Sequence, residues 1–106
     1  MLSTTQLDRE KEQTIAKVRE MLVALERGAT RVILAAQQAA NDANDDKYKA
    51  YLAFREVVDD FDTLAIVIEY KLKRVRDEKA EALAEKFDEL TAFMLSSIVT
   101  ASLHFL

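Results

Sequence analysis

Apolar residues repeat at alternating intervals of three and four through most of the chain, and this spacing constrains the fold more than any other feature. Three such runs are present, and in 106 residues there is no proline and one glycine to interrupt them. The runs are Ile15, Val18, Leu22, Leu25, Ala29, Val32, Ala36 and Ala39; Tyr51, Phe54, Val58, Phe61, Ala65, Ile68, Leu72 and Val75; and Ala80, Leu83, Phe87, Leu90, Met94, Ser97, Ala101 and His104. A mean spacing near 3.5 residues places each run on one side of an α-helix, where another helix must cover it. The sequence therefore predicts an all-α fold, an antiparallel helical bundle.

The helix ends follow from polar segments between the runs. The first helix is predicted from about Thr4 to residue 40. Residues 41–46, Asn-Asp-Ala-Asn-Asp-Asp, have short polar side chains that hydrogen-bond to their own backbone and compete with helix, so we predict a loop there. Asp45 or Asp46 would cap the next helix. The predicted helices cover residues 4–40, 46–75 and 78–104 of a single domain, 1–106.

The junction between the second and third runs leaves two alternatives open. Residues 76–79, Arg-Asp-Glu-Lys, break the register but include no residue that forbids helix. A turn with Asp77 as N-cap would give a three-helix bundle. Without a turn, the chain forms a two-helix hairpin whose second helix has about 58 residues and extends well beyond the first. The apolar end of that helix would need cover from another subunit.

Gly28 lies inside the first predicted helix, beside its apolar run. A glycine there costs about 1 kcal/mol relative to alanine. We interpret it as a position of close helix packing next to Ala29, and a functional kink is the alternative.

Composition narrows the class of protein. Half of the residues are hydrophobic and 32% are charged, which is too hydrophobic for a disordered tail. The net charge of −4 disfavours non-specific attraction to phosphate backbones. The absence of cysteine excludes disulfides, thiolate zinc sites and cysteine nucleophiles. The first residues lack the pattern of a secretory signal, so we expect a cytoplasmic protein, and no motif calls for a cofactor.

The C-terminal segment, residues 93–106, is apolar on several sides of its helix. Its 14 residues are too few to span a bilayer, which needs about 20, so we expect no membrane span. Such a surface either belongs to a wide core face or is shared with a partner. Small hydroxyl residues in the segment, such as Ser96 and Thr100, would let another helix approach closely. The predicted interface consists of Met94, Leu95, Ile98, Val99, Leu103 and Leu106.

This segment supports our main functional hypothesis. We predict a non-enzymatic helical protein-protein interaction module, of the adaptor, chaperone, inhibitor or immunity-protein type. Its partner would be another protein or a second copy of the chain, in a homodimer or a higher oligomer.

A basic cluster near the end of the second predicted helix supports an alternative hypothesis. The cluster lies within residues 71–79 and contains Lys71, Lys73, Arg74 and Arg76. It could bind nucleic acid, although Asp77 and Glu78 dilute its charge and Tyr70 is the one aromatic residue beside it. A solvated helix face is the simpler interpretation, so we expect no nucleic-acid partner.

Two pairs of acidic residues support a second alternative. Glu56 and Asp59, and then Glu85 and Asp88, are each three residues apart and so share a helix face, where carboxylates could hold Mg²⁺. This arrangement resembles the two-part acidic signature of all-α nucleoside triphosphate pyrophosphohydrolases of the MazG type. The resemblance covers these four residues, and Asp59 stands where that family usually has glutamate. It implies a magnesium-dependent phosphohydrolase that uses the four carboxylates.

Overall fold

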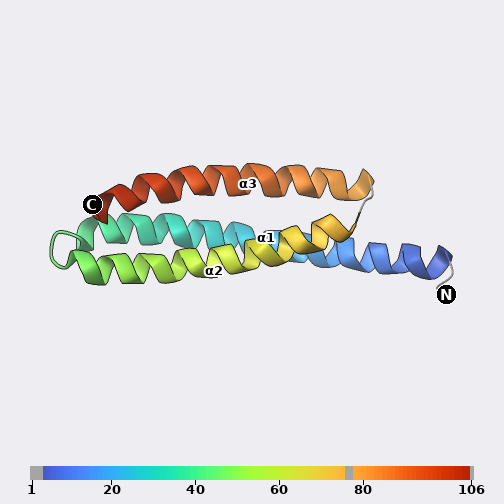
Figure 1. Ribbon diagram of the computed structural model, residues 1–106, viewed down its shortest axis with the longest axis horizontal. Helices are drawn as coiled ribbons and strands as arrows, with labels where there is room; N and C mark the ends of the chain where they lie inside the picture. Colours follow the sequence, from blue (N-terminus) through green and yellow to red (C-terminus); the bar gives the residue numbers. More distant parts are fainter. Residues whose placement is uncertain (1–3, 76–77, 106) are drawn as a thin grey trace.

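The backbone consists of three α-helices that run up, down and up along one axis. The computed structural model describes the backbone of residues 4–75 and 78–105, and the side chains of these residues except at positions 4, 5, 79 and 104. The elements are α1 (Thr4–Asp42), α2 (Lys47–Arg74), α3 (Glu78–Ser102) and a short 3₁₀ helix, η1 (Leu103–Phe105) (Figure 1). No strand occurs within the described ranges. The predicted all-α antiparallel bundle is confirmed.

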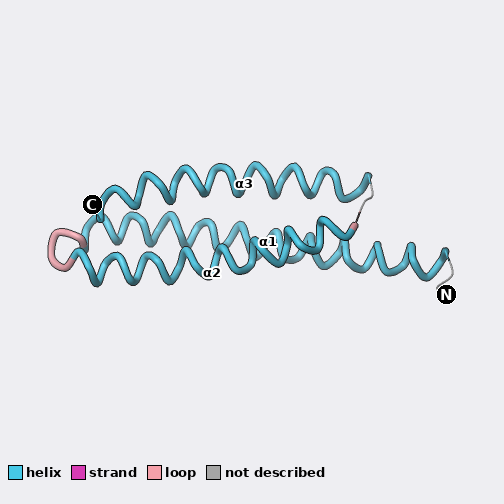
Figure 2. The backbone as a smooth tube through the Cα atoms, viewed as in Figure 1, coloured by secondary structure: helices cyan, strands magenta, loops and turns pink. Residues whose placement is uncertain are grey.

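The alternative of a long two-helix hairpin is wrong. Helix α2 ends at Arg74, and Val75 takes an extended backbone conformation with φ −110° and ψ 102°. Its N–H still donates to the carbonyl of Leu72, at 3.2 Å, which closes the last turn of α2. Figure 2 shows the chain reversing here, so that α3 returns along the bundle. Asp77, the predicted N-cap of the third helix, lies outside the described residues.

The first loop is shorter than predicted. Helix α1 continues through Asn41 and Asp42, where we expected loop, because the helical hydrogen bonds persist to the Ala43 N–H, which donates to the Ala39 carbonyl at 2.9 Å. Residues 43–46 form the connection. Asp46 is the N-cap of α2, as predicted, and its Oδ1 accepts a hydrogen bond from the Lys49 N–H at 3.0 Å.

The bundle is a rod that measures 61 by 20 by 18 Å. Helix α1 has 39 residues and a length of about 58 Å, so it sets the length of the molecule. Its N-terminal end projects beyond the other two helices (Figure 1), and residues 6–13 are all exposed. Burial starts at Ile15, which packs with Val75 and Ala80 at the far end of the core.

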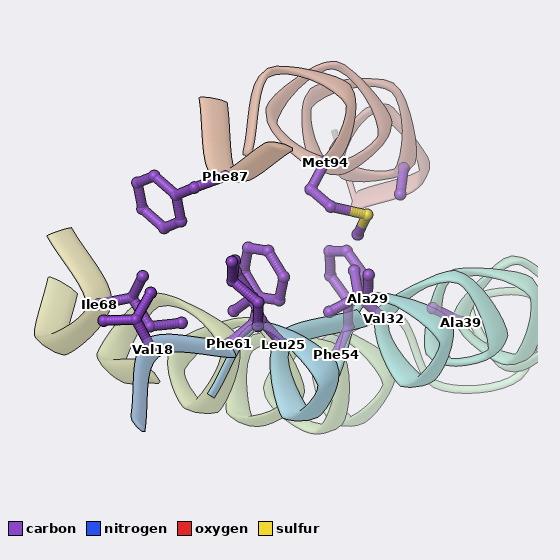
Figure 3. Close-up of a cluster of buried hydrophobic side chains, with 12 residues drawn as sticks. Val18, Leu25, Ala29, Val32, Ala39, Phe54, Phe61, Ile68, Phe87 and Met94 are labelled. Carbon is purple, nitrogen blue, oxygen red and sulfur yellow. The ribbon is translucent and has the colours of Figure 1, made fainter. Parts of the chain in front are cut away.

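All three apolar runs meet in one core. Its buried members are Val18, Leu22, Leu25, Ala29, Val32, Ala39, Phe54, Phe61, Ile68, Phe87, Met94 and Ala101. Phe54 and Phe61 of α2 point toward α3 (Figure 3). Helix α3 makes closer backbone contact with α1 than with α2, where these large rings fill the space. No polar or charged side chain is buried among the described residues, so apolar burial holds the bundle together.

Candidate functional site

The C-terminal half of α3 keeps large apolar side chains in solvent after the core is complete. Leu95, Val99 and Leu103 are 64%, 57% and 61% exposed. Leu95 and Val99 lie on the side of α3 that faces away from buried Met94 and Ala101, and Leu103, the first residue of η1, follows Val99 by four positions. We call these three residues the crest. Exposed apolar residues that adjoin one another are a common mark of an interaction surface.

The structure divides the predicted interface into three groups. Leu95, Val99 and Leu103 form the crest. Met94 is fully buried in the core, so its assignment to the predicted interface is corrected: it continues the run through Phe87 and Ala101 that faces the other helices. Ile98 is half-buried and packs against the core. Leu106 lies outside the described residues.

A shallow groove between α1 and α3 lies on one side of the crest. Its volume is about 460 Å³ and it is lined by Val32, Ile33, Ala36, Gln37, Ala40, Phe93, Ser96, Ser97, Thr100 and Ala101. Most of these side chains are small. The hydroxyls of Ser97 and Thr100 donate to carbonyl oxygens of their own helix, at 3.1 and 3.0 Å. These two donors are already satisfied within α3, so the polar groups that the groove offers a partner are chiefly those of Gln37 and Ser96, beside aliphatic side chains and the Phe93 ring.

A second hollow lies between α2 and the chain end. It has a volume of about 590 Å³ and is lined by Lys47, Tyr48, Tyr51, Ser102 and Phe105. Phe105 of η1 is held against α2 by two ring contacts, with centroids 5.5 Å from Tyr51 and 5.7 Å from Phe54. Sequence analysis did not assign Tyr48 and Tyr51 to a site. They could have been predicted from their position, because in an up-down-up bundle the start of α2 lies at the same end as the end of α3.

The basic cluster is joined by residues that sequence analysis did not connect to it. Lys71 and Arg74 line a hollow of about 490 Å³ between α1 and α2, together with Lys11 and Lys17. Lys73 is not part of its lining and pairs with Glu69, at 3.2 Å. The guanidinium carbon of Arg74 lies 5.6 Å from the centre of the Tyr70 ring. Arg76 lies outside the described residues. We call this feature the basic hollow.

The predicted magnesium ligands do not come together. Glu56 and Asp59 on α2, and Glu85 and Asp88 on α3, are all exposed. In the part of the chain that the structure describes, no three histidine or acidic side chains lie close enough to hold a metal ion. Asp59 instead faces Arg55, with 3.8 Å between Oδ2 and Nε. The four-carboxylate site is therefore not formed by these residues.

One acidic residue of α2, Asp62, has a shifted pKa. The pKa of the Asp62 carboxyl is raised above its ordinary value, first because partial burial removes water from it and second because Asp59 repels a second negative charge. Both causes disfavour the ionised form.

Protein-family models, curated proteins and solved structures give no match to this chain. None of the described helices has the length and hydropathy that crossing a membrane requires.

Proposed function

We propose that this chain is a non-enzymatic helical module that binds another protein through the crest, the α1/α3 groove and the hollow lined by Tyr48, Tyr51 and Phe105. The observation that carries the proposal is the exposure of the crest: Leu95, Val99 and Leu103 are each more than half exposed although α3 already contributes Phe87, Met94 and Ala101 to the core. Burial of apolar area stabilises a complex by about 25 cal/mol for each Å² removed from water.

The surroundings of the crest favour a helical partner. Six of the ten residues that line the α1/α3 groove are alanine, serine or threonine, and such small side chains allow a second helix backbone to come close. An amphipathic helix that lies in an apolar groove is a common mode of recognition, with anchor side chains spaced at three and four residues. This mode uses binding alone, which suits an adaptor, chaperone, inhibitor or immunity-type protein.

A pair of matched variants tests the proposal. Val99→Asp places a charge on the crest, where it would remain unpaired in a complex, so we expect loss of any complex of the wild-type protein. Ile66→Asp is the control, because Ile66 is 66% exposed on α2 and lines neither hollow. Size-exclusion chromatography with light scattering measures the complexes, and thermal melting verifies that both variants fold. A complex that survives Val99→Asp at full affinity contradicts the proposal.

A second candidate function rests on the basic hollow. Lys71 and Arg74 are separated from Lys11 and Lys17 by more than fifty positions in sequence, yet the four cations line one hollow with a single acidic residue, Glu10. Such a concentration of positive charge in an acidic protein favours an anionic ligand, and nucleic acid is the form of it that the sequence suggested.

A further inference from the structure

The basic hollow concentrates positive charge over a short length of the bundle. Lys11 and Lys17 stand about 9 Å apart along the axis of α1, and Lys71 and Arg74 about 4.5 Å apart along α2. Because α1 forms one wall and α2 the other, the cations face one space of about 490 Å³ from both sides. Sites for small molecules have volumes of about 300 to 1,000 Å³, so the hollow has the size of such a site.

The carboxylates of the protein leave most of this charge uncompensated. Lys17 is paired with Glu20, at 3.7 Å, but both side chains are more than half exposed, and pairs of this kind are weak. The other three cations of the hollow form no ion pair with a carboxylate within the described part of the chain. Glu10, which also lines the hollow, is therefore not paired with any of them. A bound anion would offset the charge that remains.

We infer that the basic hollow binds a short chain of linked phosphate groups, such as the triphosphate of a nucleotide or inorganic tripolyphosphate. The inference rests on the second candidate function, an anionic ligand in this hollow, and names the class of that ligand. Linked phosphates carry several negative charges in a small volume and present oxygens on all sides, so they can contact cations on both walls at once. The guanidinium of Arg74 offers paired N–H donors, and the lysine ammonium groups act as point charges. Gln13 adds an amide donor to the lining.

The surroundings of the hollow favour this compact anion over a nucleic-acid strand. One helical turn closer to the middle of the bundle, Met21 on α1 and Val67 on α2 are apolar. Glu20 and Glu69 lie next to these positions in sequence and are exposed. A strand carries one charge for each nucleotide, so it must extend beyond the hollow to gain more contacts, over apolar and acidic residues of a chain with a net charge of −4. Linked phosphates place all their charge inside the hollow.

Titration calorimetry at low and constant ionic strength, without added divalent cations, tests the inference. The probes are orthophosphate, tripolyphosphate, ATP, and a short and a long oligothymidylate. We expect tripolyphosphate and ATP to bind one site on each chain, at least about tenfold more tightly than orthophosphate. The long oligothymidylate should gain no affinity over the short one. Tighter binding of ATP than of tripolyphosphate identifies the source as a nucleotide, and equal affinity identifies it as the phosphate chain alone; both results support the inference.

Two pairs of matched variants locate the binding site. Lys11→Gln and Lys71→Gln each remove one cation of the hollow, from α1 and α2 respectively, and each is expected to weaken tripolyphosphate binding by at least about tenfold. Arg9→Gln and Lys73→Gln remove the same charge from the same helices, outside the lining of the hollow. These controls should weaken binding by no more than about threefold, because solvent and salt screen exposed charges at a distance. Thermal melting verifies that all four variants fold.

The outcomes separate this inference from the proposed functions. Equal weakening by the hollow variants and the controls overturns the inference, because the attraction would then come from net charge. Tighter binding of the long oligothymidylate than of tripolyphosphate also overturns it, but retains nucleic acid as the ligand of the second candidate function. A tripolyphosphate complex without an oligothymidylate complex supports the inference and removes nucleic acid. If no probe binds, the inference and the second candidate function both fail, whereas protein binding by the crest is tested separately by Val99→Asp.

Discussion

Gly28 of α1 and Phe61 of α2 mark the point where a β-carbon would just fit between two helices. A Cβ added to Gly28 would stand 3.6 Å from Cδ2 of the Phe61 ring, an ordinary van der Waals distance. The glycine has no positive φ angle, so its backbone conformation does not require glycine. Gly28 therefore faces the ring of a neighbouring helix, but packing does not require glycine here, because space remains for a methyl group.

Gly28→Ala is accordingly expected to stabilise the protein. Alanine is favoured over glycine inside a helix by about 1 kcal/mol, and the new methyl group meets the ring without a clash. For a domain of this size that gain raises Tm by roughly 4 °C or more. Thermal denaturation followed by circular dichroism measures it, with both proteins at one concentration because association also shifts Tm. A lower Tm for Gly28→Ala would show that α1 needs glycine here, as a functional kink would require.

The Asp62 carboxyl is expected to titrate above its ordinary pKa of 3.8. Desolvation is the larger cause and the charge of Asp59 the smaller, so Asp59→Asn should move the midpoint only part of the way back. Carboxyl chemical shifts recorded by NMR through an acid titration give the midpoint in both proteins. A midpoint at or below 3.8 in the wild-type protein would contradict this prediction.

The same shift predicts a pH-dependent effect of Asp62→Asn on stability. Since the pKa is raised in the folded state, the ionised carboxylate destabilises that state at neutral pH, and the penalty disappears as pH falls through the folded-state pKa and then below 3.8. Asp62→Asn should therefore stabilise the protein slightly at neutral pH and leave it unchanged near pH 3. Urea denaturation at the two pH values measures the difference.

Most of the fold could be predicted from the sequence, because the buried residues of each helix follow the three-and-four spacing of its apolar run. Every buried residue that the structure describes, except Ala50, belongs to one of the three runs, whereas Tyr51, the first member of the second run, is exposed. The choice between a reversal and a continuous helix after Val75 could not be made from the sequence, since residues 76–79 allow helix. The burial of Phe87 and Met94 against the other helices favours the reversal.

The candidate sites could be predicted only in part, because the residues that line a surface depend on which helices are neighbours in the fold. Leu95 and Val99 were predicted as interface residues from the pattern of their own helix, and both are exposed. Met94 was wrongly included, because a helix that is apolar on several sides does not reveal how much of its surface the core will cover. The basic hollow needed the pairing of α1 with α2. In an antiparallel helix pair, residues at equal numbers of positions before and after the connecting loop lie side by side. Lys17 and Lys71 are about equally far from the loop at residues 43–46, so this count could have predicted that they are neighbours.

The basic hollow predicts a difference between two lysines on the same helix. Lys71 lines the hollow, whereas Lys73 does not and is paired with Glu69. If the hollow binds nucleic acid, Lys71→Glu should weaken a complex with a single-stranded oligonucleotide much more than Lys73→Glu, although both variants change the net charge equally. Fluorescence anisotropy at low and moderate salt measures both affinities. Equal weakening would assign the effect to net charge, and no wild-type complex at low salt would remove this candidate function.

Met94 and Leu95 are adjacent in α3 and predict opposite outcomes for the same kind of truncation. Met94 is fully buried, so Met94→Ala leaves a cavity between three helices and is expected to cost about 2 to 5 kcal/mol of unfolding free energy. Leu95 is 64% exposed, so Leu95→Ala should change the stability of the monomer by no more than about 0.5 kcal/mol. Urea denaturation at a few micromolar protein measures both changes. Equal losses for the two variants at low concentration would mean that Leu95 is covered within the monomer, and the crest would then no longer be a free surface.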